Sequence, residues 1–137
     1  MAANYLMPRY YTPIQQYTAF RQKFPEWEVV WKQQGFEAKG YLRPSPLSES
    51  YHVCITYYQG KAPKVTIISP QLRPREEGGE IKHTYSDGSL CLYYPKAREW
   101  TPAQLISNTL VEWAALWLYH YETWHAIGDW LGGGVEH

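Results

Sequence analysis

The sequence predicts an α+β fold: an N-terminal helix, a four-stranded antiparallel meander, and helices at the C-terminal end. Two capping boxes carry this prediction, because residues 12–15 and 101–104 both place threonine first, proline second and glutamine fourth. Such a box marks the start of a helix. Between the boxes, residues 51–57 alternate side chains between two faces, as a strand does. A chain of 137 residues is expected to form a single domain, 1–137.

The first helix is expected to begin after Thr12, with Gln15 closing the capping box. Pro25 ends it, because the residue before a proline is driven out of the helical conformation. The residues expected to face the core, at helical spacing, are Ile14, Tyr17, Phe20 or Arg21 with its aliphatic stem, and Phe24.

Four strands are expected next, separated by short turns. They lie within 26–33, 36–44, 49–60 and 64–70, where β-branched and aromatic residues are frequent and Gly or Pro follows. Short connections join antiparallel neighbours, so the strands predict a meander. The next segment, 71–80, has no periodicity and is expected to be a surface loop.

The second capping box predicts a C-terminal helix over 102–127, about 39 Å long if it is unbroken. Gly128 is a natural stop, and a flexible glycine-rich tail is expected over about 128–137. The apolar stripe of the helix, at steps of three and four, comprises Ile106, Leu110, Trp113, Trp117, Tyr121 and Trp124.

Composition argues against several classes of function, although it leaves a local basic patch open. Thirteen basic and thirteen acidic residues cancel, which removes the bulk electrostatic argument for nucleic acid or an anionic membrane. No run reaches the roughly 18 apolar residues of a membrane span. Two cysteines and no signal peptide predict a cytoplasmic protein. The cysteines and histidines lack paired ligand spacing, so neither a metal nor a cofactor is expected.

Cys91 lies in a frame suited to chemistry. It follows an Asp-Gly turn and lies between Leu90 and Leu92. The two leucine side chains are expected to pack into the core, which leaves the Cys91 sulfur on the opposite side of the chain. A free thiol is a few per cent thiolate at pH 7, which suffices for exchange with a thioester. Cys91 is therefore the expected nucleophile, on a groove lined by His83, Tyr85, Ser89 and Trp100. Cys54, in contrast, is interpreted as a small hydrophobe on a strand face.

The segment around Cys91 resembles the active site of ubiquitin-conjugating enzymes. Their His-Pro-Asn, Gly-Ser-hydrophobic-Cys-Leu and Trp-Ser-Pro elements correspond here to 83–85, 88–92 and 100–102. Residues 62–65, Ala-Pro-Lys-Val, resemble the start of the family's fourth strand. The aromatic, glycine-rich C-terminal segment is similar to bacterial relatives encoded beside nucleotidyltransferases in cyclic-oligonucleotide anti-phage defence operons.

This resemblance implies a ubiquitin-conjugating-enzyme-like fold and a thioester-forming transferase. Cys91 would accept an activated protein C-terminus and pass it to an amine or another nucleophile. The expected partner is a cyclic-oligonucleotide-synthesising nucleotidyltransferase, bound through its C-terminus. The resemblance gives His83 an architectural role, and direct proton transfer by it is the lesser alternative.

The sequence departs from the family at two positions: Thr84 and Tyr85 stand where the family has Pro and Asn. The Asn is assigned to stabilising the oxyanion, so the donor here is the Tyr85 hydroxyl, the Ser89 hydroxyl or a backbone N–H. Two alternatives to catalysis stay open: a non-catalytic binding module that only docks a partner, and a redox-sensing thiol.

Overall fold

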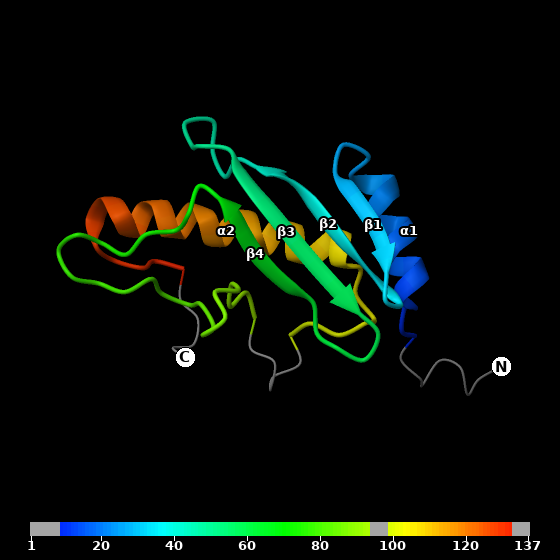
Figure 1. The fold of residues 1–137 in the computed structure, drawn as a ribbon. Coiled ribbons are helices and arrows are strands. Elements are labelled where there is room, and N and C mark those ends of the chain that lie inside the picture. Colours follow the sequence, from blue (N-terminus) through cyan, green and yellow to red (C-terminus); the bar gives the residue numbers. More distant parts are fainter. Residues whose placement is uncertain (1–8, 94–98, 133–137) are drawn as a thin grey trace.

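The computed structural model describes residues 9–93 and 99–132. Its elements, in chain order, are α1 (Pro13–Lys23), β1 (Glu28–Lys32), β2 (Gly35–Leu42), β3 (Tyr51–Tyr58), β4 (Lys64–Ser69) and α2 (Ile106–Ile127). The strands form one sheet in the order β1-β2-β3-β4, and every neighbouring pair is antiparallel. The predicted α+β fold with a four-stranded meander is confirmed (Figure 1).

The helices cover one face of the sheet. α2 runs across the back of the strands, and α1 lies beside β1 and β2 (Figure 1). The core between these layers is rich in aromatic residues, including fully buried Phe20, Phe36 and Trp124. The segment after β4 swings out beyond the C-terminal half of α2 before it returns towards the sheet (Figure 1). None of the helices in the described ranges is both long and apolar enough to cross a membrane.

The capping box of α1 is confirmed. Thr12 Oγ1 accepts the Gln15 backbone N–H, and Gln15 Oε1 accepts that of Thr12. The predicted core face is wrong at Ile14, which is 51% exposed, whereas Gln16 is 1% exposed. These positions lie on nearly opposite sides of a helix with 100° per residue. Gln16 faces inward because its side chain bonds the start of the C-terminal helix.

The predicted start of that helix at 102 is also wrong, because α2 begins at Ile106. The Gln104 side chain does accept the Thr101 N–H, at 2.9 Å, but these residues close a turn before the helix. Gln16 is the physical reason. Its Nε2 donates to the Gln104 carbonyl and its Oε1 accepts the Ile106 N–H, both at 2.8 Å. These contacts hold main-chain groups where the predicted first turn would have been.

The rest of α2 follows the prediction closely. Five members of its apolar stripe are buried, and Trp113 is partly buried. Gly128 ends the helix in the left-handed conformation, with φ 86°, and its N–H donates to the Trp124 carbonyl. The 22 residues of α2 span about 33 Å.

Candidate active site

Residues 83–91 form a small hairpin that carries the candidate nucleophile. The Cys91 N–H donates to the His83 carbonyl at 2.8 Å, and the Tyr85 N–H donates to the Ser89 carbonyl at 2.9 Å. The turn closes through the Gly88 N–H, which donates to the Tyr85 carbonyl at 2.9 Å. Gly88 has φ 87°, a conformation that glycine adopts without strain. The predicted Asp-Gly turn is therefore present.

Asp87 organises this turn. Its Oδ1 accepts the backbone N–H of Ser89 at 2.9 Å and the hydroxyl of Ser89 at 2.6 Å. Its Oδ2 accepts Lys64 Nζ at 2.8 Å, which ties the turn to the first residue of β4. The bonds from Lys64 and Ser89 hold the pKa of Asp87 well below its usual range. The carboxylate is thus ionised across the neutral pH range.

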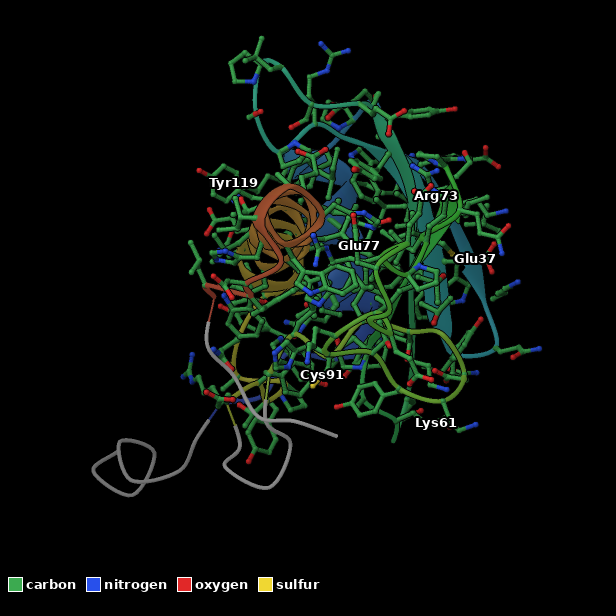
Figure 2. All side chains as sticks on the ribbon, turned by 90° about the vertical axis from the view of Figure 1, so that its left-hand side faces the viewer. Glu37, Lys61, Arg73, Glu77, Cys91 and Tyr119 are labelled. Atoms are coloured by element: carbon green, nitrogen blue, oxygen red, sulfur yellow. The ribbon has the colours of Figure 1, made fainter. Side chains whose placement is uncertain are left out.

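Two leucines anchor the second half of the hairpin. The Leu90 N–H donates to the Val65 carbonyl of β4 at 2.8 Å. The Leu90 side chain is 4% exposed, and Leu92 is partly buried against the same core. Cys91 between them is partly exposed. It lies near the lower edge of the molecule in Figure 2, a view along the axis of α2. The expected arrangement of anchored leucines and a more accessible cysteine is observed.

The Cys91 thiol has its pKa raised above the ordinary value. Burial is the main cause, and the negative charge of Glu99 adds to it. Two contacts oppose the rise: a side-chain hydrogen bond with Tyr85 and a backbone hydrogen bond with Tyr93. Sγ also donates to the Tyr93 carbonyl at 3.7 Å, a bond that favours the protonated thiol. The thiol is therefore largely protonated at neutral pH, and the bond with Tyr85 favours its thiolate.

Tyr85 reaches the sulfur across the hairpin. It faces Ser89 in the ladder and lies diagonally from Cys91, within reach of a long side chain. Burial raises the pKa of the Tyr85 phenol, and the hydrogen bond with Cys91 raises it further. The hydroxyl thus keeps its proton at neutral pH and is available as a donor. The structure brings together Tyr85 and Cys91, two of the three predicted site residues.

The third predicted residue, His83, contributes its backbone to Cys91. Its φ is 51°, an uncommon left-handed conformation for a residue other than glycine. Its carbonyl accepts the Cys91 N–H at 2.8 Å and Trp117 Nε1 at 3.1 Å. Its imidazole packs against the indole of Trp130, with ring centroids 5.1 Å apart.

The other two residues expected on the groove are largely covered. Ser89 is 2% exposed and Trp100 is 8% exposed. The Ser89 hydroxyl donates to Asp87, so it serves the turn. Trp100 packs edge-on against Tyr57, with centroids 5.7 Å apart. Burial of these side chains follows from their place where the hairpin meets the core.

Sequence reasoning missed the roles of Trp117 and Trp130. The stripe pattern predicts Trp117 in the core, and Trp130 falls in the glycine-rich tail expected over about 128–137. The sequence carries no signal that the Trp117 indole N–H meets the carbonyl of His83. The position of Trp130 depends on how the chain turns after Gly128, which periodicity does not predict.

Cys54 is separate from this site. It lies on β3, is 9% exposed, and burial raises its pKa. Cys54 and Cys91 are not joined by a disulfide. Within 9–93 and 99–132, no group of three or more His, Cys, Asp or Glu side chains is arranged to hold a metal ion.

Comparison with known proteins assigns the family. Residues 16–137 match a family model described as Type II CBASS E2 protein. No curated protein matches the chain. The match spans the helices, the sheet and the Cys91 hairpin, and it implies an E2-like role in anti-phage defence with protein partners in that system. The predicted relationship is confirmed, and the chain belongs to the family of Type II CBASS E2 proteins.

Proposed function

We propose that this protein is a thioester-forming conjugating enzyme whose nucleophile is Cys91. The observation that carries the proposal is the side-chain hydrogen bond between Tyr85 and Cys91, on a hairpin fixed to the core by its leucines. A neutral phenol beside a partly exposed sulfur favours the thiolate, which is the reactive form. Family membership supports this reading, because E2-like proteins act by conjugation.

In the proposed reaction, the Cys91 thiol loses its proton to solvent and the thiolate attacks an activated C-terminal carbonyl. A sulfur–carbon bond forms, and the bond from the carbonyl carbon to its leaving group breaks. The leaving group is that of an acyl adenylate or of an upstream thioester. An amine or another nucleophile then displaces the sulfur. No metal or diffusible cofactor takes part in these steps.

Tyr85 is the donor that we propose for the developing oxyanion. The Ser89 hydroxyl already donates to Asp87, and the Cys91 N–H already donates to the His83 carbonyl. Of the two side-chain donors expected from the sequence, the Tyr85 hydroxyl is the one that bonds the sulfur. As negative charge moves from sulfur to the carbonyl oxygen, this O–H can follow it over a short distance.

The proposed acyl donor is the C-terminus of a nucleotidyltransferase that makes cyclic oligonucleotides. The role in anti-phage defence and the expectation of protein partners support this choice. We place the reaction in the cytoplasm, where Cys54 and Cys91, which form no disulfide with each other, stay reduced.

A second candidate is a non-catalytic module that only docks its partner. The raised pKa of Cys91 favours it, because less thiolate is present than in an unperturbed cysteine. Mass spectrometry of the protein incubated with its partner and an adenylating enzyme separates the two candidates.

If the protein is a thioester-forming enzyme, we expect a hydroxylamine-labile adduct on Cys91. Cys91→Ala should abolish this adduct, and Cys91→Ser should convert it into a more stable ester. Binding without any such adduct would establish the docking module. In single-turnover kinetics, Tyr85→Phe should slow thioester formation about a hundredfold if its hydroxyl supports the oxyanion. A wild-type rate in that variant would remove Tyr85 from the chemistry.

A further inference from the structure

The chain turns back along α2 after the helix ends. Gly128 makes the turn in the left-handed conformation, with φ 86°, and a Cβ there would lie 2.7 Å from Arg75 Nη1. Four residues later the chain passes over His120 so closely that a Cβ on Gly132 would lie 2.5 Å from the imidazole. Glycine at both positions permits this path. The segment 129–132 therefore retraces the last two turns of α2.

The turn places the indole of Trp130 on a cluster of aromatic rings. Trp130 packs against Trp117 at 5.3 Å and Trp124 at 6.5 Å between ring centroids. It also packs against the rings of His83 at 5.1 Å and His120 at 6.1 Å. Trp130 is partly buried against the core. It is thus a contact between the end of the described chain and the hairpin that carries Cys91.

Trp130 contacts His83, the residue whose carbonyl accepts the Cys91 N–H. His83 holds a left-handed backbone, which is uncommon for residues other than glycine and costs some free energy unless neighbouring contacts support it. Two features support it from the same side. Trp117 Nε1 donates to the His83 carbonyl, and Trp130 covers the His83 ring while also packing on Trp117. The same carbonyl accepts the Cys91 N–H.

We propose that Trp130 is a positioning residue for Cys91, acting through His83. By holding the His83 ring, it keeps the His83 carbonyl aimed at the Cys91 N–H and keeps the hairpin in register. Tyr85 and Cys91 then remain diagonal neighbours, within hydrogen-bond reach. As a statement about catalysis this rests on the proposed function, but its structural part is testable on the free protein.

The test compares Trp130→Ala, Trp130→Phe and Leu131→Ala in the full chain. Leu131 is the matched control, since it is the next residue, large and apolar, but 66% exposed. The first measurement is hydrogen exchange of the Cys91 amide. The second is the pH midpoint of Cys91 alkylation by iodoacetamide. Neither needs a partner, so both stand even if the chain forms no thioester.

We expect Trp130→Ala to speed exchange of the Cys91 amide about tenfold, because one support of its acceptor is lost. The alkylation midpoint should move to higher pH, as the Tyr85 bond is weakened. Trp130→Phe should restore both values, and Leu131→Ala should change neither. In thioester formation, Trp130→Ala should lower kcat and leave KM unchanged.

The inference is overturned if Trp130→Ala leaves Cys91 exchange and the alkylation midpoint at their wild-type values. It is also overturned if Leu131→Ala has the same effect as Trp130→Ala, since the change would then be a general loosening of the segment. A double variant, Trp130→Ala with Tyr85→Phe, gives a further check. Its midpoint should match that of Tyr85→Phe alone, and additive shifts would contradict action through the Tyr85 bond.

Discussion

Replacing Tyr85 by phenylalanine should move the pH dependence of Cys91 reactivity upward. In the folded protein, the phenol hydroxyl donates to the sulfur and lowers the pKa of the thiol, against burial and Glu99, which raise it. The variant removes the single oxygen that makes this bond and keeps the ring that fills the space. The thiolate then loses its donor, whereas burial stays, so the pKa of Cys91 must rise further.

The size of the effect follows from the strength of such a bond. A hydrogen bond to a charged group contributes about 1.5–3 kcal/mol, and 1.36 kcal/mol corresponds to one pH unit. Because the site is partly exposed, the low end applies, and the midpoint should rise by about one pH unit. A more basic thiolate is also more nucleophilic, with a Brønsted coefficient of about 0.4–0.5.

These two effects predict crossing profiles. At neutral pH, the loss of thiolate outweighs the gain in nucleophilicity, and Tyr85→Phe should react about threefold more slowly than wild type. Above both midpoints, where each thiol is ionised, the variant should react about threefold faster. The crossing distinguishes a changed pKa from a changed exposure, since greater or lesser exposure would scale the rate at every pH.

The assay is the rate of iodoacetamide alkylation between pH 6 and 11, followed by mass spectrometry of the peptide that contains Cys91. Tyr93→Phe is the matched control. Tyr93 also lies beside the sulfur, but it contacts Sγ through its carbonyl, which the substitution keeps. The control should show the wild-type midpoint. The reasoning is refuted if Tyr85→Phe has the same midpoint as wild type, or if its profile lies on one side of the wild-type profile throughout.

Three further predictions concern stability. Gln16→Leu should lower the free energy of unfolding in urea by about 2–4 kcal/mol, because the partly buried Gln104 carbonyl and the buried Ile106 N–H lose their partner. Tyr51→Phe removes the hydroxyl that donates to Glu122 at 2.8 Å and should cost about 1–2 kcal/mol in the same assay; no change would show that water replaces it. Asp87 has a lowered pKa, so its contribution is complete above its ordinary pKa of 3.8 and is lost as pH falls through the lower folded value. The urea midpoints of wild type and Asp87→Asn should therefore differ at pH 7, and the difference should shrink as pH falls below 3.8. A difference as large at pH 2 as at pH 7 would contradict this account.

Patterns local in sequence were predictable here. The strands, their antiparallel order and the capping box of α1 follow from alternation, short turns and the Thr-Pro-x-Gln pattern. The hairpin of Cys91 follows from the Asp-Gly turn and the flanking leucines. In each case the interacting residues lie within a few positions of one another, so the interaction can be predicted from a short stretch of sequence.

Features that depend on distant partners were not predictable. Gln16 is polar and sits on a helix, where a pattern search expects it to face water, yet it bonds main-chain groups 88 and 90 residues away. The late start of α2 is a consequence of the same bonds. The left-handed backbone of His83 likewise has no local signal, because it depends on packing by Trp117 and Trp130.

The bond between Leu90 and Val65 has a consequence for the solubility of the protein. β4 is the last strand of the sheet, and an outer strand offers unpaired main-chain groups to the strands of other molecules. The Leu90 N–H occupies the Val65 carbonyl on that open side, and Lys64 adds a charge at the strand's first residue. The segment that presents the nucleophile thus also occupies one main-chain acceptor of this outer strand. A substitution that detaches this segment from β4 should therefore expose a pairing site at the sheet edge as well as displace Cys91.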